Sequence, residues 1–576
     1  MKAPRKSPPT ASRSSAWLAA GLGLLVLVCG CTFALFAAIL SERSQTTSRS
    51  ATPTADPRAA VLTLAFSPEK VNLLSPLVGD FNKQRLKTSD GRVMEVRLVE
   101  MPPDAMVDAA LGEAPPFQAL SPDASLWLDL LDLRWAEQQG RQAGEVAPRR
   151  VAQSVRFAVS PIVIAVWPEI AQELGHGIRP VGWAAIQQKA TTDRDFRWSH
   201  ASTAYASGML ATLAQFYAGA GKTRGLTEAD VLAPTTLDYV RQIESTIRFY
   251  GENEAVAMER MRSEGRDFLD ALVVQEALVV QHNRGGNDPL VAIYPHEGTL
   301  WEDHPLALLD DPTVTDNQRR TFLALAEFLL APERQRRVLE MGFRPADLSI
   351  PIDGPDSPIA PRYGVDPREP QTTLQMPGPT VVRVVQNAWR YTKRPANIYL
   401  VVDTSGSMEG EKLENVRAAL QTFIGQIQGT QDRVGMVLFA TSVYRLIPPA
   451  PLDEAHRRRL LDEIARLEAK GNTALLDGVR AAYGRLQREA DTTSINAIIA
   501  MTDGLENASS TTLSELLQVI ETDNRRGVPV LIFTIAYGDD ADQRLLRRLA
   551  EVSGGQMREG TPETIRELYR LLSQYF

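Results

Sequence analysis

Asn397-Ile-Tyr-Leu-Val-Val402 is the stretch that decides the fold of the C-terminal third, and it runs directly into Asp403-Thr404-Ser405-Gly406-Ser407. A near-continuous apolar run of this kind is typical of a strand buried on both faces of a parallel sheet. Similar runs recur further along the chain, at 434–439, 495–501 and 528–536. Because helical patterns lie between these runs, residues 396–576 are predicted to form a Rossmann-like, doubly wound α/β sheet.

Oxygen-bearing side chains follow the predicted strands where each strand ends. Asp403, Ser405 and Ser407 come directly after the first run, and Asp503 follows the third. Thr473 lies in a loop just before a predicted helix. Because doubly wound sheets bind ligands beyond the carboxyl ends of their strands, we expect these five side chains to converge. Two carboxylates and three hydroxyls suit Mg²⁺, with Mn²⁺ or Ca²⁺ as alternatives, and do not suit Zn²⁺.

This set of loops resembles the metal-ion-dependent adhesion site (MIDAS) of von Willebrand factor A (VWA) and integrin I-like domains. The resemblance implies that Ser405, Ser407 and Thr473 supply hydroxyl oxygens, while Asp403 and Asp503 act directly or through water. These side chains cannot saturate a six-coordinate ion, so a carboxylate of a protein partner could complete its shell. The alternative is a domain of the same fold that binds no metal and whose serines cap a helix.

The N-terminal region carries an uncharged segment at residues 16–40. As a helix it would span about 37 Å, which exceeds the roughly 30 Å hydrocarbon core of a membrane. Basic residues precede it, so we expect 1–15 to be a cytoplasmic tail, 16–40 a single-pass signal anchor in the cell membrane, and the rest extracytoplasmic. Residues 41–59 read as a flexible stalk. A cleaved signal peptide and a lipoprotein acylated at Cys31 remain alternatives.

Residues 60–345 alternate short apolar runs with helical patterns, which predicts a second α/β domain. Stretches such as Ser160-Pro161-Ile-Val-Ile-Ala-Val-Trp167 and Leu290-Val-Ala-Ile-Tyr-Pro-His-Glu-Gly298 resemble bacterial extracellular solute-binding proteins. The resemblance implies a type 2 periplasmic-binding-protein fold, in which two α/β lobes hold a ligand in the cleft between them.

A cleft of this kind can use helix N-termini and hydroxyl donors to hold a small solute or an anion. The candidate contacts are the serines of the strand-to-helix loops and one tyrosine expected on the opposite lobe: Ser67, Ser121, Ser125, Ser160, Ser202 and Tyr294. The alternative is that each serine only caps its own helix. The proline-dense stretch at 349–379 is expected to be an extended linker, and 380–392 a short helix; together 346–395 connect the two domains.

Composition limits the function classes. A net charge of −8 argues against a nucleic-acid partner, which would need a basic surface. No Ser/His/Asp order, nucleotide loop or carboxylate pair stands out, so we expect a binding protein and not an enzyme. The sequence therefore predicts a membrane-anchored extracytoplasmic protein that binds an acidic protein partner through its metal site. The alternative is a solute receptor or transport-accessory protein, in which the solute-binding domain is primary and the VWA domain mediates assembly.

Overall fold

The computed structural model describes residues 58–576 except for the segment 141–146 and positions 252, 287, 428, 430, 490 and 574. The predicted cytoplasmic tail, the membrane anchor, Cys31 and nearly all of the stalk lie outside the described residues. Within the described part of the chain, no helix combines the length and apolar character needed to cross a membrane. The membrane anchor therefore stays a prediction.

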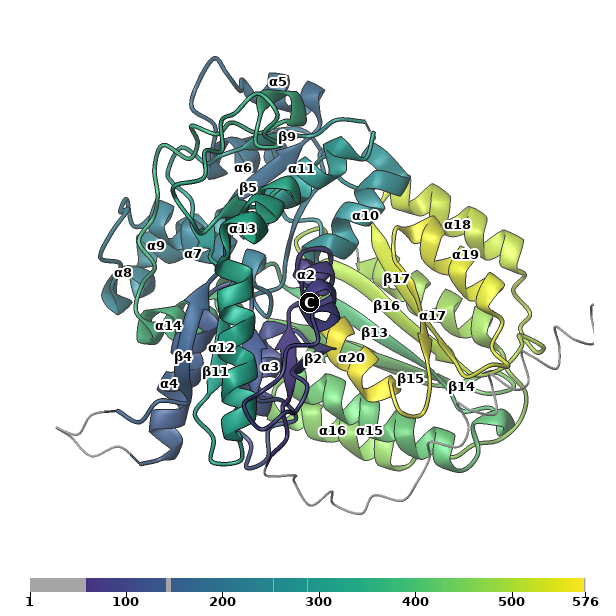
Figure 1. Cartoon of the computed structure of the whole chain (residues 1–576). Coiled ribbons are helices and arrows are strands. Elements are labelled where there is room, and N and C mark those ends of the chain that lie inside the picture. The colour runs from purple at the N-terminus through teal and green to yellow at the C-terminus, as the bar shows by residue number, and fades with distance from the viewer. Residues whose placement is uncertain are drawn as a thin grey trace, which may run out of the picture. The chain divides into compact units, whose positions relative to one another are not determined.

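The first lobe is built on a five-stranded sheet in the order β2-β1-β3-β11-β4 (Figure 1). Its strands are β1 (Val61–Phe66), β2 (Glu95–Glu100), β3 (Ala119–Ser121), β4 (Val151–Arg156) and β11 (Pro305–Leu309). β1, β2 and β3 are parallel, whereas β11 is antiparallel to both of its neighbours. Its helices are η1 (Pro68–Lys70), α2 (Val71–Lys83), α3 (Pro103–Ala110), α4 (Leu126–Gln138), α12 (Asp316–Leu330) and α13 (Pro332–Glu340).

The second lobe has a seven-stranded sheet in which β10-β5-β8-β6-β7 form the main path and β9 and β12 also pair with β5. Its strands are β5 (Ala158–Val166), β6 (Trp198–Ala201), β7 (Tyr250–Gly251), β8 (Ala271–Gln275), β9 (Val291–Ile293), β10 (Trp301–Glu302) and β12 (Arg344–Pro345). Its helices are α5 (Pro168–Leu174), α6 (Trp183–Thr192), α7 (Ala206–Gly219), α8 (Glu228–Leu232), α9 (Pro234–Glu244), α10 (Glu254–Glu264), η2 (Gly265–Asp267) and α11 (Glu276–Arg284).

Three crossings of the chain join the lobes. The chain leaves the first lobe between β4 and β5 at Phe157, returns between β10 and β11 at His304, and leaves it again between α13 and β12. The first two crossings lie side by side, because the Phe157 N–H donates to the His304 carbonyl at 3.4 Å. His304 has φ of +33°, a region that a non-glycine residue rarely occupies. The two-lobed α/β arrangement predicted from the sequence is therefore present.

The connector differs from the extended linker that its proline content predicts. Ile359, Val365 and Leu374 are buried, and the Leu374 N–H donates to the Thr299 carbonyl at 2.9 Å. Prolines remove backbone donors and prevent regular structure, but the apolar residues between them still bury their surface against the second lobe. A short η3 turn (Pro361–Tyr363) lies within the connector, and the helix predicted after it forms as α14 (Pro379–Thr392).

The C-terminal domain has a six-stranded sheet in the order β15-β14-β13-β16-β17-β18. Its strands are β13 (Ala396–Asp403), β14 (Arg433–Phe439), β15 (Val443–Pro451), β16 (Ile495–Thr502), β17 (Val530–Tyr537) and β18 (Met557–Gly560). All of its neighbouring pairs are parallel except β14 with β15. Its helices are η4 (Gly406–Met408), α15 (Glu411–Gln426), α16 (Glu454–Ala465), α17 (Leu475–Glu489), α18 (Leu513–Arg526), α19 (Gln543–Ser553) and α20 (Ile565–Ser573).

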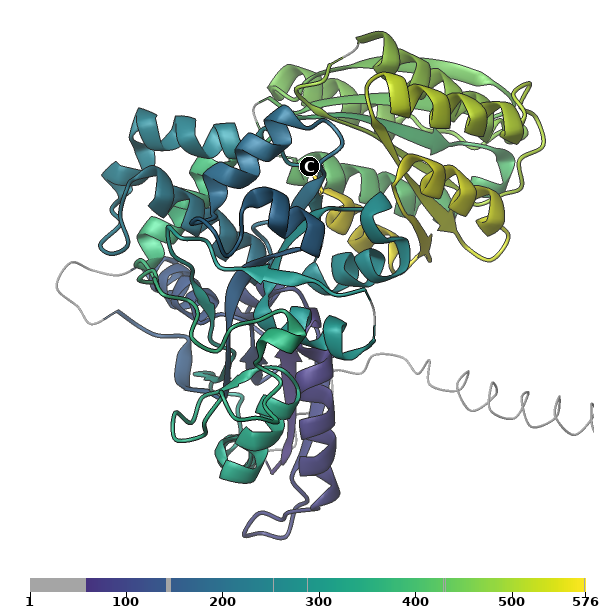
Figure 2. The same ribbon diagram turned by 90° about the horizontal axis from the view of Figure 1, so that it is seen from above.

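Both faces of this sheet are covered by helices, as Figure 2 shows. Ile398 and Leu400 of β13 belong to the core that includes α15 and α20, while Tyr399 and Val401 belong to the core with α17. Each side chain of this size stabilises the fold by about 1.5–3 kcal/mol when it is fully buried. The near-continuous apolar run at 397–402 is thus explained by burial on both faces, and the predicted doubly wound sheet is present.

Candidate metal centre

The predicted metal residues lie at the switch point of the C-terminal sheet. β13 pairs in parallel with β14 on one side and with β16 on the other, so the chain winds in opposite directions from this strand. Loops diverge at such a point and leave room for a ligand beyond the strand ends. Asp403 is the last residue of β13 and Asp503 directly follows β16, and both are fully buried.

A chain of hydrogen bonds links four of the five residues. The Ser405 N–H donates to Asp403 Oδ1 at 2.7 Å, and the Ser405 and Ser407 hydroxyl oxygens are 3.1 Å apart. The Ser407 hydroxyl donates to Asp503 Oδ1 at 2.6 Å. The other oxygen of Asp403 accepts a short hydrogen bond from the Thr502 hydroxyl. The loop after β13 and the loop after β16 therefore meet through oxygen atoms.

Thr473 completes the group from a third loop. A Cβ atom placed on Gly504 would lie 3.3 Å from Ser407 Oγ and 3.5 Å from Thr473 Oγ1, so both hydroxyls border this glycine. The Thr473 N–H donates to Asn507 Oδ1 at 2.9 Å, and the Gly406 N–H donates to the Gly471 carbonyl at 2.9 Å. These bonds brace the third loop against the other two. The structure brings all five predicted residues together.

Lys412 also reaches this site, and sequence reasoning did not single it out. It lies in the first turn of α15, and its Nζ is 2.5 Å from Asp503 Oδ2. Its side chain is 33% exposed, so the ammonium group sits at the mouth of the site. The only available signal was its position shortly after the Ser405–Ser407 loop, and that position does not reveal which way a helical side chain points.

The electrostatics of the site favour a cation. Burial raises the pKa of Asp403 to about 6, and the nearby charge of Asp503 acts in the same direction, although hydrogen bonds from Thr502 and Ser405 oppose the rise. Neighbouring ligands of an octahedral Mg²⁺ ion lie about 3 Å apart, because each is about 2.1 Å from the metal. The 3.1 Å separation of the two serine hydroxyls is close to that value. The donor set therefore fits a hard divalent cation.

The serines predicted for the solute cleft differ in their hydrogen-bond partners. Ser67 is buried at the start of η1, and its hydroxyl has no hydrogen-bond partner among the described residues. The Ser121 hydroxyl donates to the Pro305 carbonyl at 2.7 Å and accepts from Lys70 Nζ at 3.2 Å. The Ser125 N–H donates to Asp303 Oδ1 at 2.7 Å, and its hydroxyl does not cap α4. These three residues lie on the first lobe, beside its junction with the second.

The remaining cleft candidates have structural partners. The Ser160 hydroxyl accepts from the Ala277 N–H at 3.1 Å, and the Ser202 hydroxyl accepts from the Ala204 N–H at 3.3 Å. Tyr294 donates a short hydrogen bond to the buried Glu276. Tyr294 also lines a cavity of about 610 Å³ between the second lobe and the connector, and the five serines are not part of that lining. Of the six candidates, Tyr294 alone lines this cavity, while the Ser67 N–H donates to the Ser121 carbonyl at 3.3 Å on the first lobe.

Two family models match the chain. Residues 397–567 match the von Willebrand factor type A domain, and residues 62–344 match a bacterial extracellular solute-binding protein. The predicted resemblances to VWA domains and to bacterial solute-binding proteins are thereby confirmed. The chain joins a solute-binding-protein domain to a C-terminal VWA domain.

Relatives differ in how much of the chain they share. An uncharacterized protein of Mycobacterium tuberculosis strain H37Rv is 22% identical over 496 residues, a match that covers 81% of this chain and 69% of that protein. The inter-alpha-trypsin inhibitor heavy chain H4 of Sus scrofa is 28% identical over 171 residues, which is 28% of this chain and 18% of that protein. The chain spans less than a fifth of the length of the first inter-alpha-trypsin inhibitor relatives it matches.

Solved structures match each domain separately. A von Willebrand factor type A structure from Catenulispora acidiphila is 21% identical with a TM-score of 0.28, covering 31% of this chain and 42% of that one. The sulfate-binding protein of Mycobacterium tuberculosis H37Rv is 16% identical with a TM-score of 0.35, covering 50% of this chain and 88% of that one.

Proposed function

We propose that this protein is an extracytoplasmic binding protein, held at the cell membrane by one N-terminal helix, that uses Mg²⁺ at the VWA loops to bind an acidic protein partner. The convergence of Asp403, Ser405, Ser407, Thr473 and Asp503 at the switch point of the sheet carries this proposal. The presence of a solute-binding domain beside a VWA domain supports the general class of binding protein.

The residues of the site have separable tasks in this proposal. The hydroxyls of Ser405 and Ser407 would bind the ion, and the carboxylate of Asp503, which Lys412 contacts, would offset part of its charge. Asp403 is braced by the Ser405 N–H, which fixes the loop between them. When bound, the cation supplies the positive charge that a partner's aspartate or glutamate would contact. Gly504 keeps the space between the hydroxyls free of a side chain.

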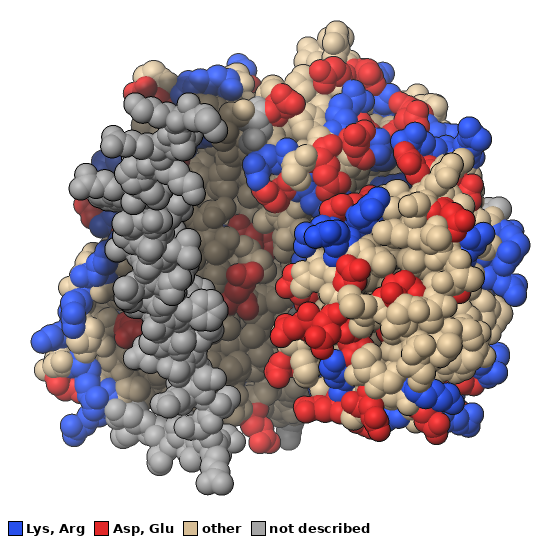
Figure 3. All heavy atoms as spheres, turned by 90° about the vertical axis from the view of Figure 1, so that its right-hand side faces the viewer, with Lys and Arg blue, Asp and Glu red and all other residues tan. Residues whose placement is uncertain are grey.

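The surface and the charge of the chain support a protein partner over nucleic acid. Over the described residues of the face in Figure 3, acidic and basic side chains are interspersed and do not form a continuous basic area. Nucleic-acid binding would require a concentrated positive surface. We assign the protein a binding role and no catalytic one.

Titration of the full chain with Mg²⁺ tests the proposed metal site. We expect one Mg²⁺ to bind with a measurable heat, and Asp403→Asn to weaken this binding by at least about tenfold because it removes a charge from the site. Asp539→Asn is a matched control, since Asp539 is an exposed carboxylate just after β17 at the same edge of the sheet. Equal Mg²⁺ binding by the wild type and by Asp403→Asn would contradict the proposal.

A role as a solute receptor is the second candidate. The unpartnered buried hydroxyl of Ser67, at the junction of the two lobes, favours a ligand between them. A shift in melting temperature of the full chain with a small molecule, retained in Asp403→Asn, would support this second role. No shift with sulfate, phosphate or a divalent metal would count against it.

A further inference from the structure

A cluster of buried polar side chains lies where the two lobes of the solute-binding domain meet. Asp123 follows β3 of the first lobe, Glu302 ends β10 of the second, and His304 lies on the crossing that returns to the first lobe. One potential ligand atom from each residue lies within 4.8 Å of those of the other two. The three residues thus face one common point, although they come from separate parts of the fold.

None of these side chains has the hydrogen bonds that burial normally demands, although Asp123 and His304 form ion-pair contacts. Asp123, Glu302 and His304 are each at most 1% exposed. Both carboxylate oxygens of Asp123 and Glu302, and both ring nitrogens of His304, lack a hydrogen-bond partner among the described residues. His304 Nδ1 is 3.5 Å from Asp123 Oδ1, and His304 Nε2 is 3.9 Å from Glu302 Oε2. A buried polar group without a partner costs about 1–3 kcal/mol, more when it is charged, so this set calls for a ligand.

The surroundings hold more acidic than basic side chains. Glu69 and Glu254 are buried nearby and bring the number of carboxyl groups around the cluster to four, whereas Lys70 supplies one ammonium group. Lys70 Nζ donates to the Pro122 carbonyl at 2.6 Å and lies 3.5 Å from Asp123 Oδ1. A bound cation would offset this excess of acidic groups.

We propose that Asp123, Glu302 and His304 bind one divalent first-row transition-metal ion between the lobes. Two carboxylates and one imidazole form a mixed set of oxygen and nitrogen ligands. Such a set suits Mn²⁺, Fe²⁺ or Zn²⁺ better than Mg²⁺ or Ca²⁺, which prefer oxygen ligands only. Ligand atoms that bind an ion at about 2.0–2.3 Å are at most about 4.6 Å apart, so the observed spacing needs only a small adjustment.

The backbone around His304 holds the imidazole at this point. Its N–H donates to the Asp123 carbonyl at 2.9 Å, which ties the crossing strand to the loop after β3. The edge of its ring packs against Phe343, with ring centroids 5.1 Å apart. A strained φ of +33° at a buried histidine is retained only where the surroundings fix it. Because the three ligands come from both lobes and their junction, metal binding would stabilise the closed arrangement of the lobes.

Mn²⁺ binding to the full chain tests this site apart from the VWA site. The double variant Asp403→Asn/Asp503→Asn removes both carboxylates of the VWA loops, and in that background we expect one Mn²⁺ per chain by electron paramagnetic resonance. His304 is the nitrogen ligand, so the bound Mn²⁺ should show coupling to ¹⁴N in an electron spin-echo modulation experiment. The VWA loops offer oxygen ligands only and would not give this coupling.

Glu302→Gln keeps the side-chain shape and is expected to weaken Mn²⁺ binding at least about tenfold. Asp303→Asn is the matched control, because the Asp303 carboxylate, one residue along, bonds to the Ser125 N–H and to Arg156 instead. It should keep both the Mn²⁺ and the nitrogen coupling. The proposal is overturned if the double variant binds no Mn²⁺, if bound Mn²⁺ shows no nitrogen coupling, or if Glu302→Gln binds as tightly as the control. A failure of the VWA loops to bind Mg²⁺ would not affect these Mn²⁺ measurements, because they are made in a variant that lacks both VWA carboxylates.

Discussion

Burial and metal binding have opposite effects on the protonation of the Asp403 carboxyl group: burial favours the protonated form, and a metal ion favours the ionised form. Burial raises its pKa from 3.8 to about 6, so without metal the folded state holds this proton more tightly than the unfolded chain does. The resulting contribution to stability is present below about pH 4 and is lost as the pH rises through 6. A cation binds the ionised form, so the stabilisation that it adds grows with pH until Asp403 is fully ionised.

This linkage predicts how Mg²⁺ changes the melting temperature. At pH 5 only about a tenth of Asp403 would be ionised, so the apparent Mg²⁺ affinity should be about tenfold lower than at pH 7.5. We expect a larger rise in melting temperature on adding Mg²⁺ at pH 7.5 than at pH 5, measured by differential scanning calorimetry. Asp403→Asn should abolish this pH dependence. An equal rise at both pH values would show that the proton on Asp403 does not compete with the ion.

Single residues of the site differ in how readily the sequence reveals them. Asp403 and Asp503 were predicted because each directly follows a long apolar strand, and parallel strands end at the same edge. Lys412 was missed because a sequence does not fix the rotation of a helix relative to a loop. His304 was missed because it lies between a two-residue strand and β11, where neither sequence periodicity nor ligand spacing gives a signal. Its role depends on which strands cross between the lobes.

At the scale of elements, the sequence predicted the buried parallel strands of the C-terminal sheet but not its edge strand β15. β13 and β16 have unbroken apolar runs, so their position in the centre of the sheet follows from hydrophobicity. β15 contains Pro448, Pro449 and Pro451, which weaken a strand pattern, yet an edge strand tolerates prolines because one side of its backbone needs no pairing. The connector also appeared structureless from its prolines, although its apolar residues pack on the second lobe.

Helix α14 is joined to the second lobe by a buried polar contact. Trp389 Nε1 donates to Glu244 Oε2 at 3.1 Å, and both residues are buried. Trp389→Phe keeps an aromatic ring but removes this donor from a buried carboxylate, so we expect the free energy of unfolding to fall by about 1–3 kcal/mol. The effect can be measured by urea denaturation monitored by circular dichroism.

Trp301→Phe is the control for Trp389→Phe, because it removes a tryptophan hydrogen bond at a site that water can reach. Its Nε1 donates to Thr373 Oγ1 at 3.3 Å in a partly exposed position, so water can replace the lost bond. We expect a loss of no more than about 0.5 kcal/mol. Equal losses in the two variants would mean that the contact between Trp389 and Glu244 contributes nothing specific to holding α14.

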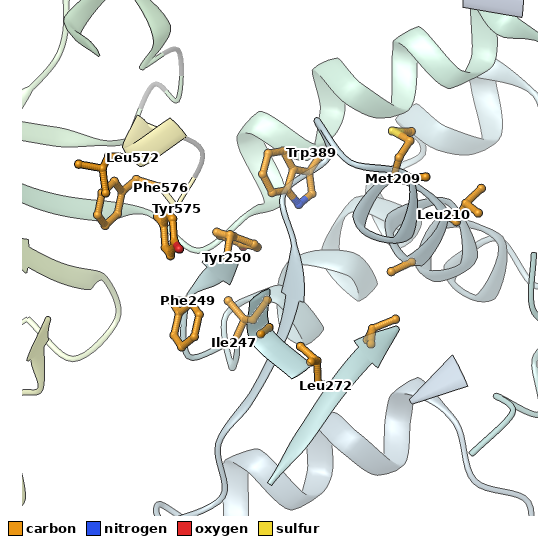
Figure 4. Close-up of a cluster of buried hydrophobic side chains, with 14 of the residues drawn as sticks. Met209, Leu210, Ile247, Phe249, Tyr250, Leu272, Trp389, Leu572, Tyr575 and Phe576 are labelled. Atoms are coloured by element: carbon orange, nitrogen blue, oxygen red, sulfur yellow. The ribbon is translucent and has the colours of Figure 1, made fainter. Parts of the chain in front are cut away.

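At the scale of the whole described chain, the last residues of the VWA domain pack against the solute-binding domain. Tyr575 stacks on Phe249 of the second lobe with ring centroids 6.2 Å apart (Figure 4). The Tyr575 ring also lies 4.9 Å from the ring of Phe533 of β17, centroid to centroid. Tyr575 and Phe576 are 3% and 4% exposed. Arg260 of α10 adds a hydrogen bond to the Gly554 carbonyl at 3.3 Å. The two domains therefore share a buried aromatic contact in addition to the connector.

Removing that contact should uncouple the unfolding of the two domains. Tyr575→Ala deletes a buried ring, and aromatic truncations of this kind cost about 3–5 kcal/mol. Because the ring contacts both domains, we expect the variant to show two separate calorimetric transitions where the wild type shows one cooperative transition. Tyr391→Ala is the matched control, since Tyr391 on α14 is 55% exposed, and it should leave the profile unchanged. If Tyr575→Ala only lowers the melting temperature without splitting the transition, the aromatic contact stabilises the VWA domain but does not couple it to the solute-binding lobes. If the wild type already melts in two transitions, the domains are thermally independent and the contact is too weak to link their unfolding.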